Sequence, residues 1–151
     1  MVKMTLNKIN NQIAVKEVMI SVNHFPILKS NCFLKEALEK MDQFKLGIAC
    51  IINDNFNLIG IITDGDLRRN LLKVQRPLPA YFLDNCIKHS IVNPLTIYDN
   101  DNLIESINEM EKKQIWDLPV VDRDKKLVGL LHMHQALKKV LNNYLQHCIK
   151  K

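Results

Sequence analysis

Long apolar runs are missing from this sequence. No stretch approaches the roughly 20 apolar residues of a membrane span, and the opening MVKMTLNKINNQ lacks the apolar core of a signal peptide. The cysteines, Cys32, Cys50, Cys86 and Cys148, are scattered, with no CxxC pair and no nearby histidine at metal-ligand spacing. We therefore expect reduced cysteines that mostly pack, in a cytoplasmic protein without a membrane segment.

Catalytic signatures and concentrated charge are also missing. The sequence has no nucleophile–base–acid set, GxSxG, P-loop or Rossmann fingerprint. Its formal charge of +5 is diffuse apart from Lys138-Lys139 and Lys150-Lys151, whereas a nucleic-acid binder concentrates such charge on one face. We expect neither an enzyme nor a nucleic-acid-binding protein.

What the sequence does contain is an internal repeat. The 151 residues, 47% hydrophobic and 25% charged, suit one compact domain or two small subdomains. Aligning Gly60 with Gly129, an offset of 69 residues (129 − 60), places IACIINDNFNLIGIITDGDL beside WDLPVVDRDKKLVGLLHMHQAL without a gap. The same offset places the stripe of Leu34, Leu38 and Met41, which has helical spacing, on the stripe of Leu103, Ile107 and Met110.

Each copy predicts the same order of elements. A helix is followed by two apolar strands, 48–52 and 58–62 in the first copy and 118–121 and 127–131 in the second. A last helix opens at about Leu67 and about Gln135, and a short extended segment precedes each copy, near 25–28 and 94–97. The predicted fold class is α+β, with two βαββα-like units related by pseudo-twofold symmetry that share a core.

The repeat also sets the predicted domain boundaries. We expect an N-terminal segment at 1–13, repeats at 14–73 and 83–141, a linker at 74–82 that holds Pro77 and Pro79, and a C-terminal helix extension at 142–151. Apolar pairs recur every four residues from Ala136-Leu137 to Cys148-Ile149. Two interpretations of this stripe remain open, packing on a second subunit or folding back on the module.

The string GIITDGDLRR has the chemistry of a ligand site. Gly60 allows close approach of backbone or ligand, and Thr63 offers a hydroxyl and amides at a helix N-terminus, where an anion is favoured. Asp66 can accept two hydroxyls of a ribose, and Arg69 can reach a phosphate. The alternative is structural, because Thr63 and Asp66 also satisfy a capping pattern that Asp64 would support without any ligand.

Two helix–strand–strand–helix units with this string after the last strand resemble a CBS domain pair. The resemblance covers roughly residues 14–141 and implies nucleotide binding at Gly60, Thr63 and Asp66. GIITDGDLRR and LVGLLHMHQAL together resemble the C-terminal CBS pair of bacterial arabinose 5-phosphate isomerases. The chain departs from the pattern in two ways: His132 and Gln135 replace the hydroxyl and acid in the second repeat, and no sugar-isomerase domain precedes the repeats.

The resemblance implies a regulatory module for a nucleotide ligand, either an adenine nucleotide or a cytidine-type sugar nucleotide, with no certain cofactor. It also implies a homodimer that acts on a sugar isomerase or sugar-nucleotide enzyme of 3-deoxy-octulosonate and lipopolysaccharide metabolism. Two alternatives stay open. The chain could be an excised C-terminal part of such an isomerase, or a dimerisation module with vestigial ligand clefts.

Two further groups of residues are ambiguous. His132 and His134 form an HxH pair without an identifiable third ligand, so metal binding, structural hydrogen bonding and contact with an acidic ligand all remain open. Trp116 and Phe44 precede strands, and we expect them to pack in the core or between subdomains.

Overall fold

The computed structural model describes residues 13–149, which form two compact units. Residues 21–95 and 123–127 make up one unit, and residues 13–20, 96–122 and 128–149 make up the other. We call them the first-repeat unit and the second-repeat unit. The predicted N-terminal segment, except Ile13, and Lys150-Lys151 lie outside the described residues, as does the side chain of His147.

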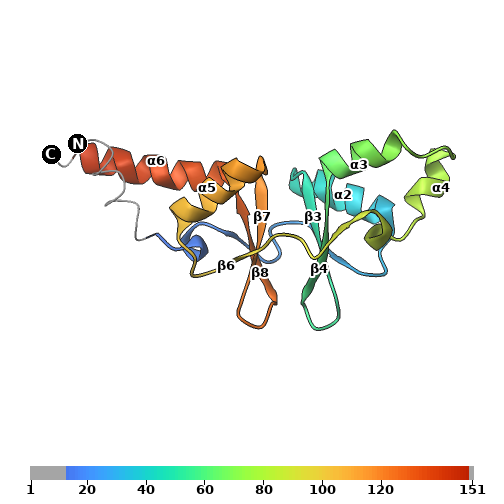
Figure 1. The fold of residues 1–151 in the computed structure, drawn as a ribbon, viewed down its shortest axis with the longest axis horizontal. Coiled ribbons are helices and arrows are strands. Elements are labelled where there is room, and N and C mark those ends of the chain that lie inside the picture. The colour runs from blue at the N-terminus through green and yellow to red at the C-terminus, as the bar shows by residue number, and fades with distance from the viewer. Residues whose placement is uncertain (1–12, 150–151) are drawn as a thin grey trace. The chain divides into compact units, whose positions relative to one another are not determined.

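The first-repeat unit is built on a sheet with strand order β2-β3-β4-β5, whose central strands β3 and β4 are labelled in Figure 1. β2 runs parallel to β3, whereas the β3–β4 and β4–β5 pairs are antiparallel. Its elements along the chain are β2 (Ile27–Lys29), α2 (Leu34–Phe44), β3 (Ile48–Ile52), β4 (Leu58–Thr63), α3 (Asp64–Leu71), α4 (Leu78–Phe82), the short 3₁₀ helix η2 (Cys86–His89) and β5 (Ile91–Val92).

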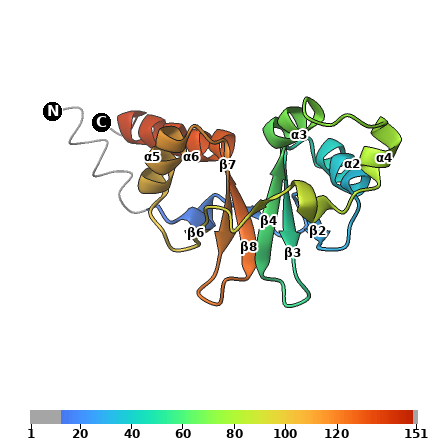
Figure 2. The same ribbon diagram turned by 45° about the vertical axis from the view of Figure 1, so that its right-hand side comes forward.

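The second-repeat unit repeats this order on a sheet of order β1-β8-β7-β6. Figure 2 shows β7 and β8 as a long hairpin like that of β3 and β4. Its elements are η1 (Val15–Glu17), β1 (Ile20–Ser21), β6 (Ile97–Tyr98), α5 (Leu103–Lys113), β7 (Asp117–Val121), β8 (Leu127–His132) and α6 (Met133–Ile149).

Equivalent residues of the two repeats form equivalent helices, α2 and α5. α2 and α5 both end at a residue in the left-handed conformation, Lys45 (φ 55°) and Gln114 (φ 53°), which lie 69 residues apart. Each helix buries one apolar stripe, and the leucine and methionine that the repeat alignment paired are buried in both units, Leu34 with Leu103 and Met41 with Met110. The predicted α+β class and the correspondence of 58–62 with 127–131 are confirmed.

The structure differs from the sequence prediction at four places. α3 begins at Asp64, three residues before the predicted start, and α6 begins at Met133, two residues before it. The predicted linker at 74–82 contains α4, whose Tyr81 is 1% exposed. Trp116 does not pack as expected, because its side chain is 70% exposed.

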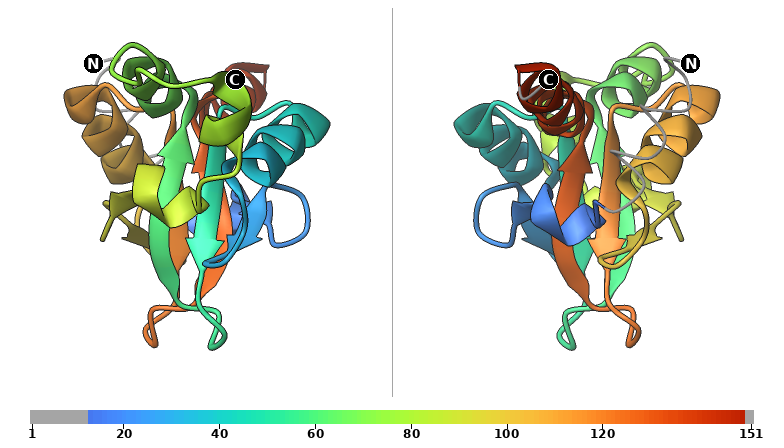
Figure 3. Two further views of the ribbon diagram at one scale, coloured as in Figure 1. Left: turned by 90° about the vertical axis from the view of Figure 1, so that its right-hand side faces the viewer. Right: turned by 90° about the vertical axis from the view of Figure 1, so that its left-hand side faces the viewer.

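The first residues of each predicted repeat pack in the unit of the other repeat. Ile13 and Val15 belong to the core that holds Leu103, and Cys86 belongs to the core that holds Leu34. Figure 3 shows η1, drawn in blue, beside the orange strands of the second-repeat unit. The compact units therefore do not follow the predicted repeat boundaries, which remain a prediction about the sequence.

Within residues 13–149, no helix has both the length and the apolar character needed to cross a membrane.

Candidate ligand site

Thr63 connects the central hairpin of the first-repeat unit directly to a helix. It is the last residue of β4 and the N-cap of α3, with an extended backbone (φ −118°, ψ 157°). Its Oγ1 accepts a hydrogen bond from the Asp66 amide (3.2 Å), and its hydroxyl donates to Oδ2 of the Asp66 side chain (2.6 Å). Because the side chain caps the helix at the end of the strand, no loop is needed between the two elements.

Arg69 completes a chain of polar contacts on α3. Its Nη2 donates to Oδ1 of Asp66 at 2.6 Å, so both carboxylate oxygens of Asp66 have a partner. The Asp66 side chain is 15% exposed and that of Arg69 is 57% exposed. The structure therefore brings together Thr63, Asp66 and Arg69, which we call the α3 cluster, with its anionic group inside and its cationic group facing solvent.

Thr63 therefore caps α3, as the structural alternative predicts. Ligand binding by Thr63 stays a prediction. The two are compatible, since each carboxylate oxygen has a second lone pair and an exposed guanidinium can exchange a carboxylate for a phosphate.

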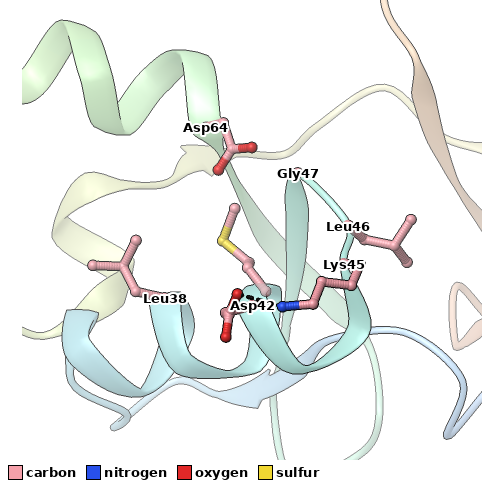
Figure 4. A pocket seen from close by; sticks show the side chains of 7 residues that line it. Leu38, Asp42, Lys45, Leu46, Gly47 and Asp64 are labelled. Carbon is pink, nitrogen blue, oxygen red and sulfur yellow. Dashed lines mark hydrogen bonds and ion pairs between the residues drawn. The ribbon is translucent and has the colours of Figure 1, made fainter.

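Asp64 lies apart from the α3 cluster. Its amide donates to the Gly47 carbonyl (3.0 Å), and its side chain lines a pocket of about 340 Å³ (Figure 4). Within the pocket wall, Lys45 Nζ and Asp42 Oδ1 form an ion pair of 2.7 Å. The remaining lining residues are Leu38, Met41, Leu46 and Gly47. A Cβ on Gly47 would lie 2.7 Å from Asp64 Oδ2, so the absence of a side chain at residue 47 leaves room for this carboxylate.

Gly60 allows a close approach, and in this structure the approaching group belongs to the chain itself. A Cβ at Gly60 would lie 2.8 Å from Ser90 Oγ and 3.3 Å from Ile87 Cδ1. Packing of the η2 segment against β4 therefore explains the glycine, and ligand contact at Gly60 remains a prediction.

In the second-repeat unit the equivalent junction has different side chains. The Met133 amide donates to the Trp116 carbonyl (2.9 Å), which repeats the bond between Asp64 and Gly47 at the 69-residue offset. His132, at the position of Thr63, places Nδ1 2.7 Å from Asp117 Oδ1. Gln135, at the position of Asp66, has a buried Oε1 without a hydrogen-bond partner among the described residues.

The two histidines of the HxH pair have different surroundings. His132 is partly buried against Asp117, whereas His134 is exposed on α6. Within residues 13–149, no three His, Cys, Asp or Glu side chains are grouped so that they could hold a metal ion. The arrangement agrees with structural hydrogen bonding by His132, and contact of either histidine with a ligand stays a prediction.

Sequence reasoning missed a polar cluster around Asp84. Arg76 and His89 both contact its carboxylate, His89 through Nε2 at 2.8 Å. The Arg76 guanidinium, together with His89, lowers the pKa of Asp84 to about 2. The Tyr81 ring packs edge-on against His89 with centroids 4.7 Å apart. These residues match no sequence motif. They come together only in the folded chain, because α4 turns the segment from Arg76 to His89 back on itself.

The site geometry can be compared with known proteins. The CBS domain family model matches residues 15–73 and 87–142. An uncharacterised protein of Helicobacter pylori is 34% identical over 128 residues, or 83% of this chain, and an arabinose 5-phosphate isomerase of Escherichia coli is 31% identical over 129 residues, or 82% of it. The structure of CBSX2 of Arabidopsis thaliana in complex with AMP has a TM-score of 0.75 at 25% identity, and the match covers 85% of this chain and 96% of CBSX2.

The coverage is unequal in the two kinds of relative. The matched region spans only 37% of the Helicobacter protein and 36% of the Escherichia isomerase, so the chain corresponds to little more than a third of these relatives. CBSX2, in contrast, is matched over nearly its whole length. Two matches to the family model, one for each repeat, show that this chain belongs to the CBS domain family and consists of a CBS pair.

Proposed function

We propose that the chain is a regulatory nucleotide-binding module without catalytic activity of its own. The α3 cluster carries this proposal, because a hydroxyl, a carboxylate and a guanidinium meet there at a helix N-terminus. CBSX2, which shares the fold and a quarter of the sequence, is described in complex with AMP. An adenine nucleotide is therefore the first candidate ligand, and a cytidine-type sugar nucleotide is the second.

The contacts follow from the chemistry of each group. Asp66, as an acceptor only, would take hydrogen bonds from the two ribose hydroxyls. Thr63 and the first amides of α3 would face the phosphate, and Arg69 would leave Asp66 to pair with it. Asp64 borders the adjacent pocket, and His132 and His134 would meet an acidic end of the ligand.

The similarity to arabinose 5-phosphate isomerases supports a finer proposal. The regulated partner would be a sugar isomerase or sugar-nucleotide enzyme of 3-deoxy-octulosonate and lipopolysaccharide synthesis, in the cytoplasm, with the module acting as a homodimer. Since the matched region spans only 36–37% of the Helicobacter protein and the Escherichia isomerase, the same module could equally be the C-terminal part of such an isomerase. Sequencing the gene upstream of Met1 decides between these two settings.

Titration calorimetry with AMP and with a cytidine sugar nucleotide tests the ligand proposal. We expect one of them to bind, and a ligand at 100 times its Kd should add about 2.7 kcal/mol to the free energy of unfolding. The competing function is a dimerisation module with vestigial clefts. It is favoured by the hydrogen bonds that Thr63 and Asp66 make to each other, which need no ligand. Absence of heat and of a melting shift with both nucleotides would support that function instead.

A further inference from the structure

Cys32 and Cys86 lie opposite each other in a two-stranded contact of the first-repeat unit. Phe33 and Asn85 form an antiparallel bridge, and the Cys86 amide donates to the Cys32 carbonyl at 2.9 Å. Residues opposed and hydrogen-bonded in this way have Cα atoms about 5.5 Å apart with side chains on one face. This separation falls within the range of about 4.4 to 6.8 Å that a disulfide spans.

The two thiols also share a neighbour. The Cys86 thiol approaches the Lys29 carbonyl (3.8 Å), and the Cys32 thiol interacts with the backbone of the same residue. Cys86 is fully buried, whereas Cys32 is partly exposed. The matching ladder in the second-repeat unit joins the Val15 amide to the Asp101 carbonyl (2.9 Å), so only the first-repeat unit has cysteines in these positions.

We propose that Cys32 and Cys86 form a reversible intrachain disulfide, in which Cys32 reacts first and Cys86 resolves. With a small-molecule disulfide such as oxidised glutathione, the Cys32 thiolate attacks one sulfur, forms a mixed disulfide and releases one glutathione. The Cys86 thiolate then attacks the Cys32 sulfur and releases the second glutathione. Two protein thiols are oxidised, and one glutathione disulfide is reduced to two thiols.

The surroundings of the thiols set the rate of this reaction. Burial, with a further contribution from Glu36, raises the pKa of Cys32, while Lys40 and the Lys29 backbone oppose the rise. Burial raises the pKa of Cys86 to about 11, and the nearby Cys32 and Glu36 add to the rise. Since the thiolate is the nucleophile, oxidation should be slow at neutral pH and should accelerate as the pH is raised.

The disulfide would link the start of the predicted second repeat covalently to the rest of the first-repeat unit. It would close a loop of 54 residues (86 − 32), and η2 would be linked covalently to the turn before α2. Ile87, within η2, and Ser90, directly after it, lie where a Cβ of Gly60 would be in contact with them, and β4 leads from Gly60 to Thr63. Oxidation would therefore rigidify the support of the α3 cluster, and the disulfide can be tested without any ligand.

The test uses the full chain carrying Cys148→Ser, which removes the exposed thiol that could link two molecules. After incubation with oxidised glutathione at pH 8.5, peptide mapping should find a Cys32–Cys86 linkage, with Cys50 still alkylatable after unfolding. The melting temperature should rise by about 10 °C and return on reduction with dithiothreitol.

Single Cys32→Ser and Cys86→Ser variants in the same background are the controls, and neither should show the linkage or the melting shift. Cys32→Ser removes a partly exposed thiol, so it keeps the comparison valid if the buried change at Cys86 impairs folding. Persistence of a glutathione adduct on Cys32 without the crosslink, or a crosslink to Cys50, would overturn the proposal.

Discussion

At the residue scale, the two repeats place different side chains on the same backbone. The amide–carbonyl bond that begins the last helix is identical in both, yet Thr63 and Asp66 in one repeat become His132 and Gln135 in the other. A carboxylate accepts two hydroxyl protons strongly, whereas a neutral amide does so weakly. We therefore expect the first repeat to offer the better ribose site of the two.

Substituting Asp66 tests this asymmetry. A hydrogen bond to a charged group contributes about 1.5–3 kcal/mol, so Asp66→Ala should weaken nucleotide binding by about 10- to 150-fold. The helix start should survive, because Thr63 still caps the Asp66 amide. Calorimetry on Gln135→Ala, the matched change in the second repeat, should show a much smaller loss. Equal losses in both variants would refute the asymmetric site.

Asp84 should make the fold sensitive to acid. Its pKa lies at about 2 in the folded chain because Arg76 and His89 stabilise the carboxylate, against about 3.9 when unfolded. Its contribution to stability is therefore complete above pH 4 and is lost as the pH falls towards 2. Melting curves between pH 2 and 5 should show a shallower acid decline for Asp84→Asn than for the parent. The exposed Asp54→Asn is the control, and an unchanged acid decline for Asp84→Asn would contradict the assignment.

At the scale of elements, the sequence was most informative where the two copies agreed. The stripes of α2 and α5 and the two central hairpins follow from apolar spacing alone. The start of α3 was misplaced because a side chain, Thr63, replaces the expected loop. α4 was not predicted, because the prolines in this segment favour a linker. Its buried residue, Tyr81, has no equivalent in the repeat alignment. The contacts among Thr63, Asp66 and Arg69 lie within one motif and could be predicted as a group, with their ligand role still a prediction, but the cluster around Asp84 depends on tertiary contacts.

Tyr81 should be the residue that holds α4 in place. It is 1% exposed and packs in the core that contains Leu34 and Cys86. Tyr81→Ala should lower the free energy of unfolding by about 3–5 kcal/mol, as for other large aromatic truncations. Tyr81→Phe keeps the ring and should cost far less. Urea denaturation of both variants provides the measurement, and similar midpoints would show that α4 is a loose linker.

Two glycines next to the site should respond oppositely to alanine. Gly60→Ala would press its Cβ against Ser90 at 2.8 Å, and overpacking of this kind costs about 1–3 kcal/mol. At Gly65 the added Cβ meets the flexible end of Arg69 at 3.2 Å, so Gly65→Ala should be neutral or slightly stabilising. Thermal melting compares them, and a stable Gly60→Ala would show that η2 moves aside easily.

At the scale of the whole molecule, α6 has two unlike sides. Ala136 is fully buried and Val140 is partly buried, whereas Leu137, Leu141 and Leu145 are 44%, 59% and 55% exposed. The sequence left open whether the stripe packs on the module or on another subunit. The structure assigns part of it to the module, and the exposed leucines support the proposed homodimer.

A charge on the exposed side should therefore separate the subunits. Leu141→Asp would place a carboxylate among apolar groups, and light scattering at tens of micromolar should change from a dimeric to a monomeric mass. Asn142→Asp, one position along and also exposed, should leave the dimer intact. A monomeric mass for the parent chain would remove the basis for this interface.

The packing of the start of each predicted repeat in the unit of the other repeat has a consequence for how the chain is made. During synthesis the first-repeat unit cannot be completed when its own repeat emerges, because it also needs residues up to 95 and the turn at 123–127. Residues 13–20 are made early, yet their partners around Leu103 and Leu131 are made more than 80 residues later. Such distant contacts slow folding. Because each core also needs residues of the other repeat, neither repeat should fold when expressed alone, and the pair is the smallest unit expected to fold.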